Sequence, residues 1–285
     1  MNMSKTFTNP RALALCLLLA APLCDATRAR AQSNPKDKTP AAQATPQTNP
    51  RANPQPAAAP TTPTEVVRAF YKALREARFR DALMMSVYRP AIEGLAAQEV
   101  EELRPDFERL ATQVPPDYDF TGEQLSGDEA TVFMKSGEGK DVKIEPVYLV
   151  RGAGGAWVVG DRAGAAEVKR QGKKFFFEQR IAVHEQDAED MLRRIQAAQL
   201  AYALQNAGSF GDLNALVRAG YIPQDILGSE TTGYRFTVNV SPDAKSFTAR
   251  AEPERYGRTG RLSFYLDKSG IQKKDVGGKP LSPSR

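Results

Sequence analysis

The sequence is poor in the residues that most often perform chemistry. It has two cysteines, one histidine and one tryptophan among 285 residues. Both cysteines, Cys16 and Cys24, lie near the N-terminus, so the rest of the chain has no thiol for a disulfide, a metal site or a nucleophile. A single histidine, His184, leaves little from which a Ser-His-Asp arrangement or a zinc site could be built.

Recognisable ligand-binding motifs are also missing. The Gly-Ala-Gly-Gly run at residues 152–155 lies between two predicted strands and does not open a helix, so it is a hairpin signal and not a phosphate loop. His184 lies in a strongly charged segment, and we expect its side chain to face solvent. The sequence singles out no catalytic, cofactor-binding or metal-ligating residue, and we expect no cofactor.

The first 31 residues have the pattern of a secretory signal peptide. A charged start is followed by an apolar run at residues 12–23, which is too short to span a bilayer, and then by the small-x-small cleavage signal Ala29-Arg30-Ala31. We therefore expect an exported protein, periplasmic or extracellular. An uncleaved anchor is the alternative, whereas a lipoprotein is disfavoured because the residue before Cys24 is not small.

Loss of this leader would change the charge balance. The whole chain has a net charge of +5, of which the leader contributes +3, so the remainder carries +2. Charges of both signs are mixed along that remainder, which is typical of a solvated surface. Global charge therefore gives no support for nucleic-acid binding.

Residues 32–62 are rich in Pro, Ala, Gln, Thr and Asn and have almost no large apolar side chain. Such a segment cannot bury enough surface to offset its ordering entropy, and we expect a disordered linker that proline keeps extended.

Ordered structure is predicted to begin at residue 63. Thr62-Pro63-Thr64-Glu65 is a capping box with proline at the first helical position. A second helical stretch covers about 95–110, where Pro105 must either kink the helix or start a new one. The period then changes, and three strands are predicted at residues 130–134, 142–150 and 156–159.

The opening Thr62-Pro63-Thr64-Glu65-Val66-Val67-Arg68-Ala69-Phe70-Tyr71 and the closing Gly155-Ala156-Trp157-Val158-Val159-Gly160-Asp161 resemble the NTF2-like (cystatin-like) superfamily, over residues 63–162. The resemblance implies a curved antiparallel sheet around helices, with an apolar pocket in the cone. Some members are isomerases, dehydratases or cyclases, and the candidate groups here would be Tyr71, Asp81 and Tyr88. Asp81 follows Arg80, where a surface or capping role is commoner, and Trp157 is expected in the core.

Residues 163–174 are expected to be a charged connector, followed by a long helix at about 175–206 that ends before Gly208. A short helix near Leu213 and four strands come next, and residues 275–285 are expected to be a disordered tail. The strands are predicted at 234–240, 246–251, 261–267 and 271–273.

This second region, assigned to residues 175–274, resembles the globular part of a bacterial type IV pilin or type II secretion pseudopilin. The matching residues are Leu192–Gln199 with Tyr202, Gly208-Ser209-Phe210, Leu213, Leu216, Gly220-Tyr221-Ile222, Gly233–Thr237, Phe247–Pro253 and Gly260–Asp267.

Two departures from that family bear on function. The apolar helix through which pilins polymerise is missing, because residues 175–187 hold three phenylalanines but too many charges for a membrane. The loop where major pseudopilins bind calcium corresponds here to residues 253–259, which have one carboxylate and two arginines. Calcium prefers six or more oxygen ligands, so the calcium site is not transferred.

The sequence therefore predicts an α+β protein of two domains, an NTF2-like cone and a pilin-like helix packed on a small antiparallel sheet. The leading hypothesis is a non-catalytic envelope protein that acts as a binding or assembly module. One alternative is an accessory component of a type IV pilus or type II secretion machine, with pilus or secretion proteins as partners. The other is a small-ligand carrier or acid–base enzyme that uses the NTF2-like pocket.

Overall fold

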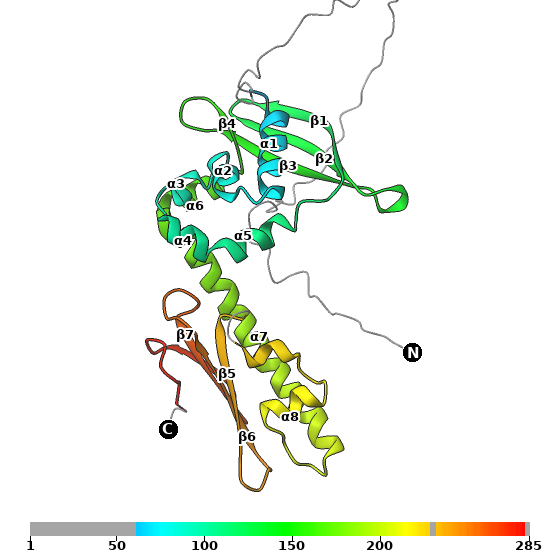
Figure 1. Cartoon of the computed structure of the whole chain (residues 1–285), viewed down its shortest axis with the longest axis vertical. Coiled ribbons are helices and arrows are strands. Elements are labelled where there is room, and N and C mark those ends of the chain that lie inside the picture. The colour runs from blue at the N-terminus through cyan, green and yellow to red at the C-terminus, as the bar shows by residue number, and fades with distance from the viewer. Residues whose placement is uncertain (1–60, 229–231, 283–285) are drawn as a thin grey trace, which may run out of the picture.

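A computed structural model describes residues 61–228 and 232–282. The fold is α+β, with two four-stranded antiparallel sheets and one long helix (Figure 1). The expected signal peptide and most of the expected linker lie outside the described residues. Within the described ranges, no helix is both long and apolar enough to cross a bilayer.

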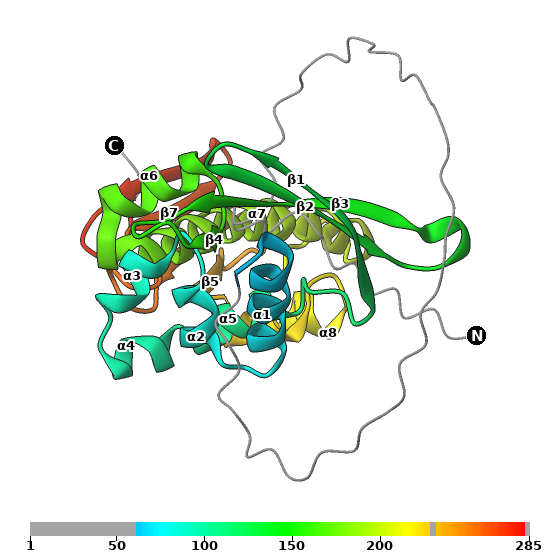
Figure 2. The ribbon, with the colours of Figure 1, turned by 90° about the horizontal axis from the view of Figure 1, so that it is seen from above.

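The first helix begins where the sequence predicts. α1 (Pro63–Arg75) is capped by Thr62, whose hydroxyl accepts a hydrogen bond from Glu65 N at 3.2 Å while the Glu65 carboxylate accepts from Thr62 N at 3.1 Å. This reciprocal capping box satisfies two backbone donors that would otherwise lack partners. One face of α1 is buried and packs against the first sheet (Figure 2).

Four short helices follow and form one end of the first unit. They are α2 (Phe79–Met84), α3 (Arg89–Glu93), α4 (Ala97–Glu102) and α5 (Arg104–Ala111). Pro105 lies in the first turn of α5, so of the two possibilities for this residue the structure shows a new helix.

The first sheet has the order β1-β2-β3-β4. Its strands are β1 (Tyr118–Ser126), β2 (Glu129–Ser136), β3 (Lys143–Arg151) and β4 (Trp157–Val159), with η1 (Gly139–Asp141) in the β2–β3 hairpin. The last three confirm the predicted strands. β1 was not predicted, because its residues are almost all exposed and show no alternation of buried and exposed positions.

The expected connector at 163–174 is mostly helix. α6 (Arg162–Gln171) is capped by Asp161, whose carboxylate accepts from Gly164 N at 2.6 Å, and η2 (Gly172–Lys174) leads out of it. Val168 is fully buried in the first hydrophobic core. The segment is therefore part of the first unit and not a tether.

α7 (Phe175–Gln205) runs through both units, as Figure 1 shows. Phe175, Phe176 and Phe177 belong to the first core, whereas the second core begins at Ala188 and continues with Leu192 on the same helix. The changeover between cores therefore lies inside α7, and the boundary expected before Phe175 does not match the packing. A single helix shared by two cores restricts how the units can move.

The second unit follows the sequence prediction closely. α8 (Leu213–Arg218) and η3 (Gln224–Leu227) lead into a sheet of order β5-β6-β7-β8. Its strands are β5 (Tyr234–Val240), β6 (Phe247–Pro253), β7 (Leu262–Asp267) and β8 (Gly270–Asp275). β8 is longer than expected and takes in Asp275, the first residue of the expected tail. Leu192 and Ile195 are fully buried between α7 and this sheet, each worth about 1.5–3 kcal/mol of hydrophobic stabilisation.

Candidate functional site

The first unit is filled by packed side chains at the place where the NTF2-like resemblance implies an open pocket. Between α1, α5 and β4 there is a cavity of about 30 Å³, bordered by Tyr71 and Tyr88 among mostly apolar side chains. That volume holds about one or two water molecules, whereas small-molecule sites usually measure about 300–1,000 Å³. This cavity cannot take a metabolite in the described conformation.

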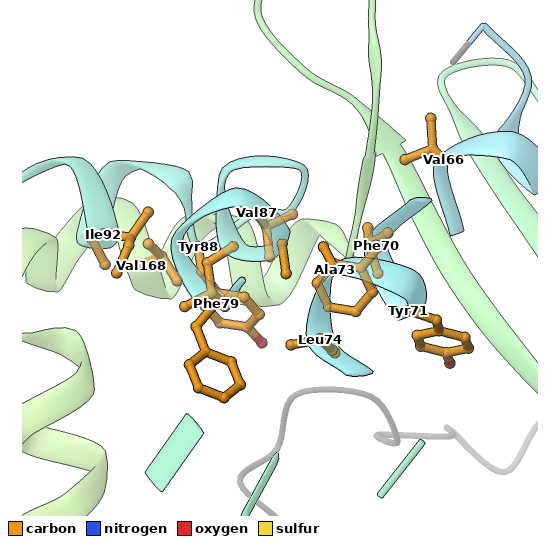
Figure 3. Close-up of a cluster of buried hydrophobic side chains, with 14 of the residues drawn as sticks. Val66, Phe70, Tyr71, Ala73, Leu74, Phe79, Val87, Tyr88, Ile92 and Val168 are labelled. Atoms are coloured by element: carbon orange, nitrogen blue, oxygen red, sulfur yellow. The ribbon is translucent and has the colours of Figure 1, made fainter. Parts of the chain in front are cut away.

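The two candidate tyrosines are core residues. Tyr71 and Tyr88 are each only 4% exposed, and Figure 3 shows them among the aliphatic and aromatic side chains of this core. Burial raises the pKa of Tyr71 far above its ordinary value, with a smaller contribution from the charge of Glu145. The ring of Tyr88 lies 5.3 Å from that of Phe175, centroid to centroid. A tyrosine held neutral in this way is a poor proton acceptor or donor near pH 7.

Asp81 is not brought together with the tyrosines. Its side chain is exposed and pairs with Arg78 at 2.8 Å. It borders a different, open hollow of about 360 Å³ between α2 and α4. The surface role expected for Asp81 is therefore the one observed. Trp157 is buried in the first core, as predicted, and the guanidinium of Arg151 lies 4.3 Å from its ring centre.

The best-defined polar cluster lies where the two units meet. The loop between β6 and β7, residues 254–261, extends from the second sheet onto α4 and α7, and we call it the latch loop. Arg255 Nη2 lies 3.0 Å from Glu102 Oε1, and Arg258 Nη2 lies 3.4 Å from Glu99 Oε1. The loop's arginines thus bind glutamates of the first unit.

The same loop is also held along α7. Arg261 donates two hydrogen bonds to the Glu178 carboxylate, at 2.7 and 2.6 Å, in the bidentate geometry that guanidinium and carboxylate favour. Glu185 Oε1 accepts from the backbone N–H groups of Arg261 and Leu262 at 2.8 and 3.1 Å. The guanidinium of Arg258 lies 4.2 Å from the ring centre of Phe177. The latch loop is fixed through side chains and backbone together.

A buried arginine supports this network from the first unit. Arg180 of α7 is bonded to the Asp106 carboxylate, to the Glu102 carbonyl oxygen at 2.6 Å and to Glu102 Oε1 at 3.3 Å. Its side chain is only 7% exposed, so these acceptors compensate its lost hydration. Glu102 therefore connects a buried cation of the first unit with a cation of the latch loop.

Two carboxyl groups of the network, those of Glu178 and Glu99, have a pKa below the ordinary value. Hydrogen bonding to Arg261 lowers the pKa of Glu178. The pKa of Glu99 is lowered mainly by the hydrogen bond from Ala96 N and additionally by Arg258. Both glutamates stay ionised, and both ion pairs persist, to a lower pH than ordinary glutamates would allow.

The expectation that His184 faces solvent is wrong. Its side chain is buried, and Nδ1 lies 3.1 Å from the carbonyl oxygen of Thr259 in the latch loop. A Cβ added to Gly233 would lie only 2.2 Å from the same ring, so the backbone just before β5 packs directly on the histidine. The ring is covered by Gly233 and Thr259, which lie 49 and 75 residues further along the chain than His184. The charged residues next to His184 in the sequence give no information about these distant contacts.

These contacts form a structural junction between the two cores. Among residues 61–228 and 232–282, no group of three or more His, Cys, Asp or Glu side chains is arranged to hold a metal ion. The sequence showed the arginines of the latch loop, but their partners Glu99 and Glu102 precede them by about 150 residues. No protein-family model matches the chain, and no curated protein and no solved structure is significantly similar to it.

Proposed function

We propose that the protein is a non-catalytic, exported bacterial envelope protein in which an NTF2-like unit and a pilin-like unit form one rigid binding or assembly module. The observation that supports this proposal most strongly is the latch loop, because its ion pairs with Glu99 and Glu102 join the two units beside the helix that they share. A fixed arrangement of two units is useful to a module that presents one surface to a partner.

Two further observations favour a binding role over catalysis. The cavity in the first unit, at about 30 Å³, is too small for a substrate. Of the three candidate catalytic groups, two are buried core tyrosines and the third is an exposed aspartate paired with Arg78. An enzyme of this fold would need an open cone with a carboxylate inside it.

Sideways docking onto a pilus or secretion machine receives less support. An apolar exposed edge on the second sheet would favour it. Instead, β5 exposes Arg235, Thr237 and Asn239, and β8 exposes Lys273 and Lys274. Charged and polar edge strands are typical of sheets that avoid strand addition.

The proposal is tested by capture from cells that make the protein, cross-linked before lysis and analysed by mass spectrometry. Three full-length forms are compared: the natural sequence, the latch variant Arg255→Glu/Arg258→Glu, and the control Arg75→Glu/Arg218→Glu, which makes the same charge change at exposed arginines away from the latch. We expect the natural and control forms to recover the same envelope proteins and the latch variant to lose them. Recovery of no envelope protein by the natural form contradicts the proposal.

A further inference from the structure

His184 occupies the point where the latch loop, the entry to β5 and α7 meet. The chain has no other histidine. The residue is 8% exposed, and its ring is covered by Gly233 on one side and bonded to Thr259 O through Nδ1 on another. Since a carbonyl oxygen only accepts hydrogen bonds, Nδ1 must hold the proton, and the neutral ring then leaves Nε2 unprotonated.

A second proton would make this ring a cation in an unfavourable place. α5 contributes Asp106 and Arg109 near the ring, and α7 contributes Arg180. Asp106, which is also bonded to Arg180, favours a protonated ring, whereas Arg180 and Arg109 disfavour it, so the cost of the second proton comes mainly from burial. The latch loop contacts the ring through the Thr259 carbonyl, and the uncharged Gly233 at the entry to β5 packs against it.

These surroundings fix the direction of the proton linkage. Burial is the main reason that the pKa of His184 lies below its ordinary value of 6.5, and it outweighs the opposing effects of Asp106 and the Thr259 carbonyl; Arg180 and Arg109 make smaller contributions that also lower the pKa. In an open state the ring would be hydrated and would titrate near 6.5. We call the latch closed when residues 254–261 lie on α4 and α7. The neutral His184 ring therefore contributes its full stabilisation to the closed latch above pH 6.5, and this contribution is lost as the pH falls from 6.5 to the pKa of His184 in the closed latch.

We propose that His184 is a proton-sensitive contact of the latch: protonation of its buried ring releases residues 254–261 from α4 and α7 and loosens the junction between the two units, which stay joined by α7. The latch loop is the element that responds, because Thr259 contacts the ring directly and Arg261 and Leu262 follow within three residues. The inference concerns the junction alone and stands whether or not a partner binds.

The first test is a proton NMR titration of the full-length chain without a histidine tag, where a single imidazole signal reports His184. We expect its midpoint below pH 6.5. The variant Arg109→Gln removes a neighbouring cation and should move the midpoint upward, whereas the control Arg75→Gln, on an exposed face of α1, should leave it unchanged. A natural midpoint at or above 6.5 overturns the proposal.

The second test follows the latch itself through hydrogen exchange of the Arg261 and Leu262 amides, which donate to Glu185 when the latch is closed. After correction for the intrinsic exchange rate, the equilibrium constant for opening of the latch should increase up to tenfold for each pH unit as the pH falls from 6.5 to the His184 midpoint. His184→Asn keeps a donor near the position of Nδ1 but cannot titrate, so its opening should not depend on pH in this window. The same pH dependence in His184→Asn, or none in the natural chain, overturns the proposal.

Discussion

Glu102 Oε1 lies 3.0 Å from Arg255 Nη2, across the boundary between the two cores. The same oxygen lies 3.3 Å from Nη1 of Arg180, which is buried in the first unit. One carboxylate thus neutralises a cation from each side of the junction. Removing it would leave Arg180 with fewer acceptors and the latch loop with one ion pair fewer.

We therefore expect Glu102→Gln to lower the free energy of unfolding by about 1–2 kcal/mol, the range for hydrogen bonds to charged groups that are partly buried. The control is Glu101→Gln, whose carboxylate pairs with Arg104 on the surface and whose side chain is 61% exposed. That change should cost less than about 0.5 kcal/mol. Urea unfolding measures both, and equal losses would contradict the assignment of Glu102 to the junction.

Gly260, the penultimate residue of the latch loop, lies in a space that admits no side chain. A Cβ there would lie 2.1 Å from the hydroxyl oxygen of Tyr234, which itself donates to Leu262 O at 2.8 Å. We expect Gly260→Ala to destabilise the protein by about 1–3 kcal/mol through this overlap. Gly122→Ala, in β1 with open space around the added carbon, is the matched control and should be close to neutral or stabilising. Thermal unfolding separates the two, and a neutral Gly260→Ala would count against the packing described.

Ala77 follows α1 in a left-handed conformation, with φ of 55°. This conformation costs a residue with a Cβ about 1–2 kcal/mol, and the extra freedom of glycine in the unfolded chain offsets about half of that. Ala77→Gly should therefore raise the free energy of unfolding by about 0.5 kcal/mol. Ala219 also follows a helix but has φ of −78°, so Ala219→Gly should be destabilising. We therefore predict that the two substitutions change the free energy of unfolding in opposite directions. Chemical unfolding measures both, and two changes of the same sign would refute the prediction.

The raised pKa of Tyr71 makes stability depend on pH in alkaline solution. Burial favours the neutral phenol in the folded state, whereas the unfolded chain ionises near pH 10. Stability should therefore fall as the pH rises above 10, by up to about 1.4 kcal/mol per pH unit from this residue. Tyr71→Phe should show a shallower fall between pH 10 and 11 in unfolding experiments. An unchanged slope would mean that Tyr71 is hydrated and would contradict its burial in the first core.

The elements that sequence predicted well are those with strong local patterns. β5 alternates between buried and exposed residues, with Tyr234, Phe236 and Val238 buried, and buried positions of β6 also recur at every second residue. The capping box at Thr62 and the proline at the start of α5 are equally local signals. In each case the information lies within a few residues of the element that it predicts.

The features that sequence missed depend on contacts between distant segments. β1 is stabilised by pairing with β2 and has little apolar pattern of its own. α6 buries mainly Val168, so its composition resembles a linker. His184 lies on a charged helix and is buried because Thr259 and Gly233, from distant segments, pack against its ring. The junction that dominates the candidate site was therefore beyond reach of the sequence alone.

The most direct test of the account is whether the two units form one body. Spin labels at Gln98→Cys on α4 and Lys268→Cys in the β7–β8 turn, both exposed positions, report the distance between units in the full-length chain with Cys16 and Cys24 changed to serine. At pH 7.5 we predict one narrow distance distribution, which broadens in Arg255→Glu/Arg258→Glu. A broad distribution in the chain without that change, or a narrow one that the latch variant leaves unaltered, would contradict a latch-held module.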